Sequence, residues 1–180
     1  MTPSHASTAP QWADDIFQQF KTHRITLVSF VPDAGHQRLI ERCQGDTEMR
    51  AVTLTTEEEG VALAAGAYLG GVRAALLIQS SGVGNCINML SLPQVCQIPL
   101  VMLVTMRGEW GEFNPWQVPM GSSTPAVLAA SGVTVFRAES AAEVGPTVDG
   151  ALQLAWQSRR RVAVLLSQRL IGAKRFEASK

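Results

Sequence analysis

From residue 25 onward, the chain alternates between short runs that are apolar throughout and longer stretches with helical periodicity. The apolar runs are ITLVSF (25–30), AVTL (51–54), RAALLIQ (73–79), PLVMLVT (99–105), VTVF (133–136) and RVAVLLS (161–167). Because both faces of each run are apolar, we expect strands that are covered on both sides, as in parallel sheets. Strands that alternate with helices predict an α/β fold with a single doubly wound, mostly parallel six-stranded sheet and helices on both faces.

The segments around these runs carry the helical patterns. Helices are predicted over residues 11–22, 34–43, 57–70, 83–92, 123–131 and 140–157. Trp12, Ile16 and Phe20 recur at helical spacing, which gives the first helix one apolar face. The sequence has no internal repeat and no internal linker, so we predict one domain over residues 11–180, preceded by a disordered lead over residues 1–10.

Composition excludes several classes of function. With 180 residues and 46% hydrophobic content, the chain can form one domain with a full-sized core. The chain has 15 basic residues (Lys and Arg) and 15 acidic residues (Asp and Glu), so it has no excess of positive charge to attract a nucleic acid. No apolar run approaches the roughly 18–20 residues that span a membrane. Cys43, Cys86 and Cys96 form no CxxC motif and no even set. They imply neither a disulfide framework nor a zinc site, and we expect a cytoplasmic protein.

Four loops that follow predicted strands have unusual compositions, at the edge of the sheet where such folds bind ligands. They are VPDAGH (31–36), TTEEEG (55–60), QSSGVGN (79–85) and TMRGEWGEFNPWQ (105–117). In the third loop, Gly82 and Gly84 suggest a dinucleotide fingerprint, but its third glycine position is Ile87 and the next strand ends without an acid. These departures exclude a nicotinamide or flavin site. A Gly-rich turn remains, offering backbone N–H groups and the side chains of Ser80, Ser81 and Asn85 to a polar ligand or a neighbouring chain's cofactor.

The acidic loop TTEEEG permits a structural and a functional interpretation. Thr55 or Thr56 as N-cap, with a glutamate three residues later, forms a capping box, and the helix dipole favours acids in the first turn. This structural role suffices for any one of the three glutamates taken alone. The small residues that follow, within VALAAGAYLGG (61–71), fit close contact with a sheet or another helix.

These four loops, in this order, resemble the pyrimidine-binding domain of thiamine-diphosphate-dependent 2-oxoacid decarboxylases. Within that superfamily the chain is most similar to the sulfopyruvate decarboxylase alpha subunit and to phosphonopyruvate decarboxylase. The resemblance covers about residues 25–170. Its most specific parts are EEEGVALAAGAYLGG (57–71), QSSGVGNCIN (79–88) and RGEWGE (107–112), with weaker support from VPDA (31–34).

The resemblance implies thiamine diphosphate as cofactor and a role for one glutamate. In this family a glutamate hydrogen-bonds N1′ of the cofactor's aminopyrimidine, which promotes the ylid whose ring later serves as electron sink for decarboxylation. That glutamate lies nine residues before a glycine of the small-residue helix, and counting back from Gly66 gives Glu57. Glu58 would need a one-residue shift, and Glu59 points about 200° around the helix from Glu57. Glu57 is therefore the predicted catalytic acid, with Glu58 left open.

The resemblance also suggests the other site residues. The predicted cofactor-binding residues are Glu57, Ser80, Ser81, Gly82 and Asn85, and the predicted substrate-binding residues are Arg107, Pro32 and Asp33. Arg107 could bind an anionic substrate with its planar fork, or form an ion pair with Glu109 or Glu112. His36 could donate a proton near the cofactor, but a histidine on a helix surface is the preferred interpretation. The long loop over residues 105–121 suggests a lid or a partner contact.

The sequence lacks the family's diphosphate-binding half, in which a GDG motif and a later Asn hold Mg²⁺. The nearest matches, at residues 45–47 and 148–150, have neither the motif nor its context, so we assign no metal site to this chain. We expect Mg²⁺ on a separate beta subunit, in an alpha/beta hetero-oligomer with self-association. The expected substrate is a small anionic 2-oxo acid such as sulfopyruvate or phosphonopyruvate, and neither nucleic acid nor membrane is expected as a partner. Two alternatives are a non-catalytic regulatory or structural subunit and an enzyme that ligates or oxidises the same carbanion.

Overall fold

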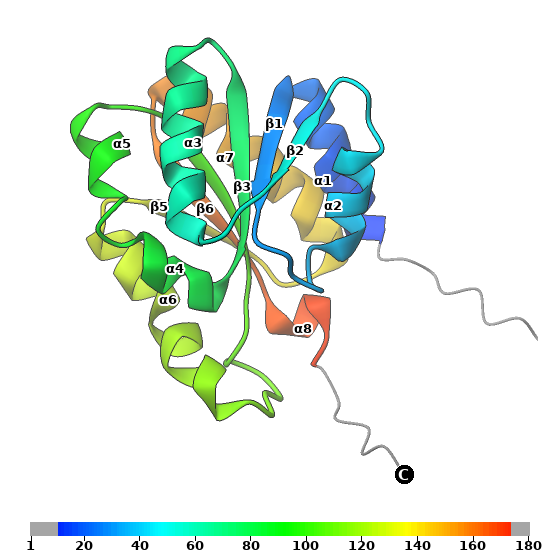
Figure 1. Ribbon diagram of the computed structural model, residues 1–180. Coiled ribbons are helices and arrows are strands. Elements are labelled where there is room, and N and C mark those ends of the chain that lie inside the picture. The colour runs from blue at the N-terminus through cyan, green and yellow to red at the C-terminus, as the bar shows by residue number, and fades with distance from the viewer. Residues whose placement is uncertain (1–10, 174–180) are drawn as a thin grey trace, which may run out of the picture.

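The computed structural model describes residues 11–173, which form a six-stranded sheet with helices on both faces (Figure 1). The strands are β1 (Ile25–Phe30), β2 (Arg50–Thr53), β3 (Arg73–Gln79), β4 (Leu100–Thr105), β5 (Thr134–Ala138) and β6 (Arg161–Leu166). Their order in the sheet is β2-β1-β3-β4-β6-β5, and every pairing of neighbours is parallel. The predicted fold class is confirmed. The predicted lead over residues 1–10 lies outside the described residues.

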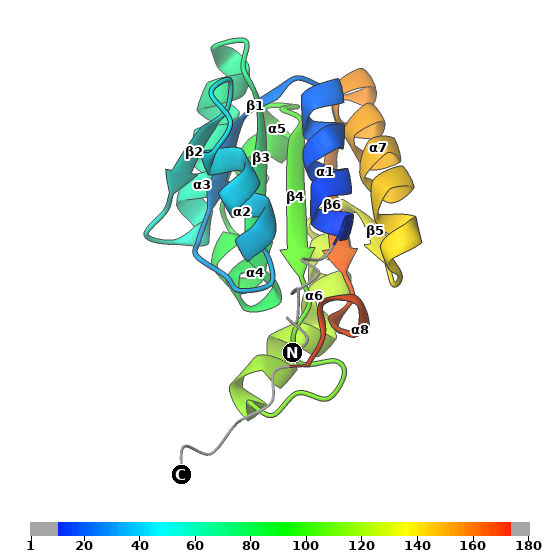
Figure 2. The ribbon, with the colours of Figure 1, turned by 90° about the vertical axis from the view of Figure 1, so that its right-hand side faces the viewer.

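The helices form two layers, one on each side of the sheet (Figure 2). Helices α1 (Gln11–Thr22), α2 (Gln37–Gln44) and α7 (Ala141–Ser158) contribute to the core on one face. The other face is covered by α3 (Glu57–Leu69), α4 (Ser80–Cys86), α5 (Ser91–Val95) and α6 (Val118–Ala130), while the 3₁₀ helix η1 (Pro115–Gln117) and α8 (Gln168–Ile171) lie near the carboxyl ends of the strands. Within residues 11–173, no helix has the length and apolar character needed to cross a membrane.

The central strands are buried on both faces, which accounts for their continuous apolar sequences. In β3, Leu77 belongs to the core cluster with α1 and α7, whereas Leu76 and Ile78 belong to the cluster with α3 and α4. Alternate side chains therefore enter different cores, which favours apolar residues on both faces of the strand. This double burial fixes the sheet as a rigid platform for the loops at its edge.

The predicted bounds of three helices are wrong, and one of these helices is α2, which begins at Gln37 rather than at residue 34. The helix predicted over 83–92 is two short helices, because the Gly-rich segment predicted as a turn is helical from Ser80, and α5 begins afresh at Ser91. Pro93 lies in the first turn of α5, where its missing N–H costs no hydrogen bond. Helix α6 begins at residue 118, before the predicted 123, and has Pro119 in its first turn for the same reason.

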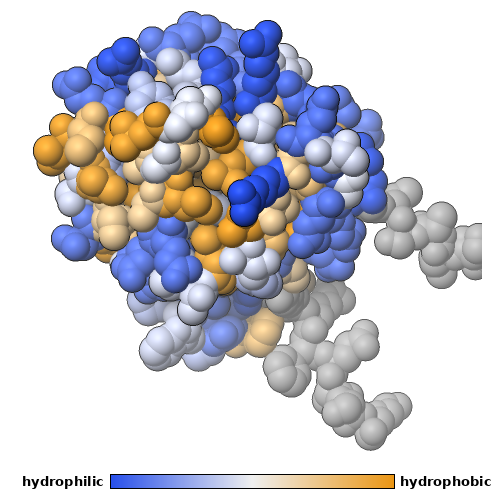
Figure 3. Space-filling view, turned by 45° about the horizontal axis from the view of Figure 1, so that its top comes forward, coloured by the Kyte–Doolittle hydropathy of each residue, from blue (hydrophilic) through white to orange (hydrophobic). Residues whose placement is uncertain are grey.

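Part of the molecular surface is apolar. Leu69, at the end of α3, and Val95, at the end of α5, have exposed fractions of 79% and 81%. Figure 3 shows hydrophobic residues gathered on the face seen there. These side chains lie at the helix ends away from the loops that carry the candidate site residues.

The strand order places the four unusual loops together. The chain leaves β1 toward β2 on one side and later returns to add β3 on the other side of β1. In open parallel sheets, the carboxyl ends of the strands at such a reversal border the crevice that binds ligands. The loops after β1, β2, β3 and β4 all reach this edge of the sheet.

Candidate functional site

The first turn of α3 gives its acidic residues different environments. One carboxylate oxygen of Glu59, Oε2, accepts hydrogen bonds from the backbone N–H groups of Thr55 at 2.9 Å and Thr56 at 3.5 Å. This is the capping box predicted from the sequence, and it assigns the capping role to Glu59. Glu58 is exposed, whereas Glu57 is half-buried and lies against α4.

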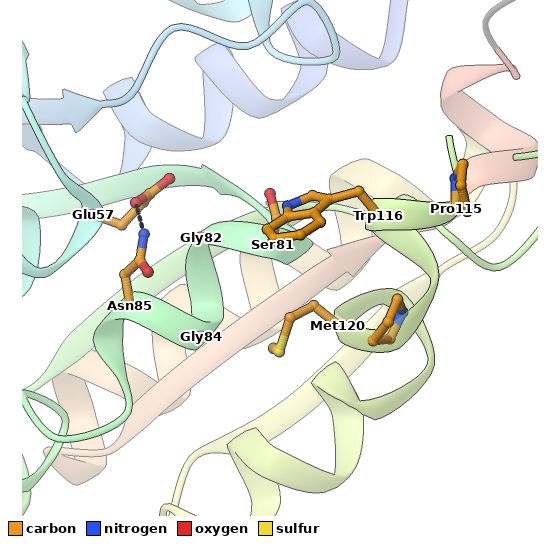
Figure 4. Close-up of a pocket in the computed structure, with 9 residues that line it drawn as sticks. Glu57, Ser81, Gly82, Gly84, Asn85, Pro115, Trp116 and Met120 are labelled. Carbon is orange, nitrogen blue, oxygen red and sulfur yellow. Dashed lines mark hydrogen bonds between the residues drawn. The ribbon is translucent and has the colours of Figure 1, made fainter. Parts of the chain in front are cut away.

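Glu57 is fixed by two residues of α4. Its Oε2 accepts a hydrogen bond of 2.7 Å from Nδ2 of Asn85 (Figure 4). A Cβ atom at Gly82 would overlap the Glu57 carboxylate, so the glycine allows the acid to lie directly against the helix. The sequence thus brings an acid from the first turn of α3 and an amide from α4 into one site.

These side chains border a cleft of about 790 Å³. Its lining residues are Glu57, Ser81, Gly82, Gly84, Asn85, Pro115, Trp116, Pro119 and Met120. The cleft has polar groups from α3 and α4, and its remaining wall is built from apolar residues of η1 and α6. Four of the predicted cofactor-binding residues therefore meet in one cavity. The apolar wall was not among the predicted site residues.

Ser80, the fifth predicted cofactor-binding residue, does not line the cleft. Its side chain is buried, and its Oγ accepts a hydrogen bond of 3.0 Å from the backbone N–H of Arg107. Ser80 thus links the start of α4 to the end of β4. Its cofactor-binding role stays a prediction.

A chain of hydrogen bonds joins the ends of β1, β3 and β4. Asp33 accepts from Nε2 of Gln79 at 2.9 Å and from Oγ1 of Thr105 at 2.6 Å. The amide oxygen of Gln79 in turn accepts from the hydroxyl of Ser81 at 3.0 Å, so the chain reaches the cleft. Pro32 and Asp33 themselves line a separate cavity of about 540 Å³ beside α2. The substrate-binding role predicted for these two residues stays a prediction.

Arg107 forms a bidentate ion pair with Glu112, one of the two arrangements expected from the sequence. Its Nε and Nη2 each lie 2.6 Å from a carboxylate oxygen, and the two side chains are only 9% and 4% exposed. Glu112 also accepts from the backbone N–H groups of Gly108 and Asn114 and from the side chain of Gln168. These donors, Arg107 above all, lower the pKa of Glu112 to about 2.

Arg107 is not among the residues that line the Glu57 cleft. Arg107 lines a smaller cavity of about 250 Å³, together with Asp33, rather than the cleft that contains Glu57. The other candidate partner, Glu109, pairs instead with Arg137 at 2.7 Å. Arg107 therefore anchors the loop after β4, and a role in substrate binding stays a prediction.

His36 is fully buried, and the preferred interpretation as a helix-surface histidine is wrong. Its Nε2 lies 3.2 Å from the carbonyl oxygen of Ile78 and 3.1 Å from that of Leu103. Because carbonyl oxygens only accept hydrogen bonds, Nε2 must carry the proton. Burial lowers the pKa of His36, which keeps the ring neutral. The helical pattern missed this position because His36 precedes α2 and its ring contacts backbone carbonyl groups of β3 and β4.

Comparison with a protein-family model defines the class of this protein. The model described as the thiamine pyrophosphate enzyme, N-terminal TPP binding domain, matches residues 11–113. The chain belongs to this family of thiamine-pyrophosphate enzymes.

Within residues 11–173, no three His, Cys, Asp or Glu side chains are grouped so that they could hold a metal ion.

The similar proteins agree with the resemblance seen in the sequence. The chain is 34% identical over 155 residues to the sulfopyruvate decarboxylase subunit alpha of Methanothermobacter thermautotrophicus, covering 86% of this chain and 94% of that protein. It is 31% identical to the corresponding subunit of Methanococcus maripaludis, with 86% and 93% covered. The phosphonopyruvate decarboxylase of Streptomyces viridochromogenes is 43% identical over 106 residues, which are 58% of this chain and 27% of that protein.

A solved structure supports the fold. A 2-oxoglutarate:ferredoxin oxidoreductase from Magnetococcus marinus superimposes with a TM-score of 0.73 at 15% sequence identity. The match covers 89% of this chain and 29% of that one. At this level of identity the match bears on the fold alone, and it agrees with the pyrimidine-domain fold expected from the sequence.

Proposed function

We propose that this chain is the pyrimidine-binding subunit of a thiamine-diphosphate-dependent decarboxylase of a small anionic 2-oxo acid such as sulfopyruvate. Relatives named as alpha subunits of sulfopyruvate decarboxylase align over nearly their whole length. The phosphonopyruvate decarboxylase aligns over 27% of its own length. In the proposal, a separate beta subunit supplies the diphosphate-binding part and the Mg²⁺ ion.

The observation that carries the proposal is the position of the Glu57 carboxylate. Helix capping is performed by Glu59, so Glu57 is not needed for it. Asn85 donates to Oε2 of Glu57, and among the described residues no donor occupies Oε1. A half-buried carboxylate with an available oxygen can accept a hydrogen bond from a ligand in the cleft and exchange a proton with it.

The residues of the cleft fit the aminopyrimidine end of the cofactor. Glu57 would bind a ring nitrogen, Asn85 would hold the carboxylate in place, and Gly82 leaves room for the acid beside the helix. Among the residues that the structure describes, none that lines the cleft is cationic, so in this proposal the charged end of the cofactor binds to another chain. When bound, thiamine diphosphate supplies the electron sink that stabilises the carbanion left by carbon dioxide.

The proposal is tested by a matched pair of variants in the complex with the beta subunit. Glu57→Gln keeps the size of the side chain but cannot relay a proton, so we expect the decarboxylation rate with sulfopyruvate to fall by about 10²- to 10⁴-fold. Glu59→Gln should change the rate little and cost about 1 kcal/mol or less of folding stability through the weakened cap. Similar rates for both variants would contradict the proposal. The chain without its partner should be inactive.

A further inference from the structure

The largest apolar side chain at the cleft is almost fully solvated. Trp116 has an exposed fraction of 82%, although it lines the cleft that contains Glu57. Figure 4 shows the side chains of Trp116 and Met120 at the same cleft, and both line it together with Ser81. Aromatic side chains contribute most when they are buried, so an exposed indole inside a ligand-sized cavity indicates a surface that a ligand covers.

The backbone that carries Trp116 is held in place, although its ring is free. The backbone N–H of Trp116 donates to Oδ1 of Asn114 at 3.1 Å, and the N–H of Asn114 donates to Glu112 at 3.0 Å. Glu112 is in turn bound by Arg107 at the end of β4. A chain of hydrogen bonds thus fixes the backbone of Trp116 relative to the sheet, so the indole is attached at the cleft before any ligand arrives.

Met120 completes the wall next to the backbone of α4. A Cβ atom placed on Gly84 would lie 3.4 Å from the sulfur of Met120, so the thioether packs directly over the glycine. A methionine side chain is flexible and polarisable, and it adapts to the shape of an aromatic ligand. The cleft therefore offers a flat aromatic surface, an adaptable thioether and, from α3, a hydrogen-bonding carboxylate.

We infer that Trp116 and Met120 form the wall against which a flat heteroaromatic ring packs while the edge of that ring is hydrogen-bonded to Glu57. The inference rests on the proposed function, in which the ring is the aminopyrimidine of the cofactor. Both wall residues lie beyond residues 11–113, which match the family model, so the family match does not assign them. Trp116 is thus a ring-positioning residue contributed by the loop after β4.

The test uses the full chain and the probe 4-amino-5-hydroxymethyl-2-methylpyrimidine, which carries the ring without the diphosphate. Binding is followed by the indole N–H signals in a ¹H–¹⁵N spectrum, with the Trp116 signal identified from its absence in Trp116→Phe. We expect this signal to move on titration. Trp116→Ala should weaken binding of the probe about ten- to hundred-fold, as for lost base–aromatic stacking, and Trp116→Phe should retain most of the affinity.

Two further variants separate this inference from the proposed function. Trp110→Phe changes a tryptophan of the same loop that does not line the cleft, and it should bind the probe like the unmodified chain. If Glu57→Gln weakens binding and Trp116→Ala does not, the inference about the Trp116 wall is wrong and the proposed function stands. If Trp116→Ala weakens binding and Glu57→Gln does not, the wall binds rings but the acid does not orient them, and the proposed function is wrong. No movement of the Trp116 signal up to the solubility limit of the probe overturns the inference.

Discussion

At the end of β4, the guanidinium of Arg107 is occupied by a carboxylate of its own chain. Glu112 accepts from Nε and Nη2, which form one edge of the planar guanidinium. An external anion would have to displace Glu112 or bind through the remaining N–H groups of Nη1 and Nη2, and a bidentate charge-assisted pair is among the stronger polar interactions in proteins. The geometry therefore favours the structural role for Arg107 over the substrate-binding role.

The two roles of Arg107 predict different substrate profiles. Because Glu112 is bound to the Nε and Nη2 groups of Arg107, we expect Arg107→Met to lower the activity of the assembled enzyme by a similar factor with sulfopyruvate and with pyruvate. Steady-state rates with both substrates measure this ratio. A deficit confined to the doubly charged substrate would show that Arg107 binds its second anionic group.

The same ion pair predicts a pH dependence of stability. Arg107 and the other donors hold the pKa of Glu112 at about 2 in the folded chain, below its ordinary value of 4.5. The stabilisation is therefore complete above about pH 4.5 and is lost progressively as the pH falls toward 2. We expect the difference in unfolding free energy between the unmodified chain and Glu112→Gln to be largest at pH 6–7 and to shrink by pH 3. Chemical denaturation at each pH measures this difference.

The control for the pH experiment is Arg107→Met, which removes the donor with the largest effect on the Glu112 carboxylate. Its difference from the unmodified chain should shrink over the same pH range, because the same interaction is lost. A difference that stays constant from pH 7 to pH 3 in both variants would show that the ion pair contributes nothing to stability. That result is usual for exposed pairs but unexpected for side chains that are 9% and 4% exposed.

At the scale of elements, two helical glycines have opposite roles. A Cβ atom on Gly121, in α6, would overlap the carbonyl oxygen of Arg107 and approach the backbone of Gly108. Gly66, in α3, is exposed, and a Cβ atom there would meet nothing within 4 Å. Gly121 lets α6 pack against the end of β4. Gly66 makes no such contact, and it lowers the stability of α3 relative to an alanine.

This contrast gives a prediction for a matched pair of substitutions. Gly66→Ala should stabilise the isolated chain by about 0.5–1 kcal/mol, because alanine restricts the unfolded chain and fits the helix. Gly121→Ala should destabilise it by about 1–3 kcal/mol or more, because the backbone it meets cannot move aside cheaply. Thermal unfolding of both variants measures the effects. Equal melting temperatures would contradict the close packing of α6.

The elements that the sequence predicted well are those whose patterns reflect burial on a known face. The bounds of α1, β1 and β3 agree with prediction, because long apolar stretches leave little choice of period. The Gly-rich segment that forms α4 was missed, since glycine has a low helix propensity that tertiary packing here overrides. Glu57 was predicted, with Glu58 left open, from the glutamate-to-glycine spacing that the family resemblance implies. The contacts of Arg107 with Glu112 and of Trp116 with the cleft depend on how a long loop folds, which no periodic pattern encodes.

For the whole molecule, the distribution of charge around the cleft is informative. The chain has equal numbers of basic and acidic residues, yet the part of it within residues 11–173 lines the cleft with one carboxylate and no cation. A diphosphate group close to Glu57 would gain no ion pair from these lining residues. This agrees with the proposal that the chain binds the neutral ring of such a cofactor and that another chain binds its strongly anionic end.

This charge distribution predicts the relative affinities of the isolated chain for thiamine and for thiamine diphosphate. If the cleft recognises the ring but not the diphosphate, as we propose, the chain alone should bind thiamine and thiamine diphosphate with similar, weak affinities, whether or not Mg²⁺ is present. Addition of the beta subunit should raise the affinity for thiamine diphosphate far more than that for thiamine, and this gain should require Mg²⁺, which links diphosphate oxygens to carboxylate ligands. Isothermal titration of each ligand, with Mg²⁺ and with a chelator, measures the four affinities before and after mixing. Tight, Mg²⁺-dependent binding of thiamine diphosphate by the chain alone would place the diphosphate site on this subunit and would contradict the division of the cofactor between two chains.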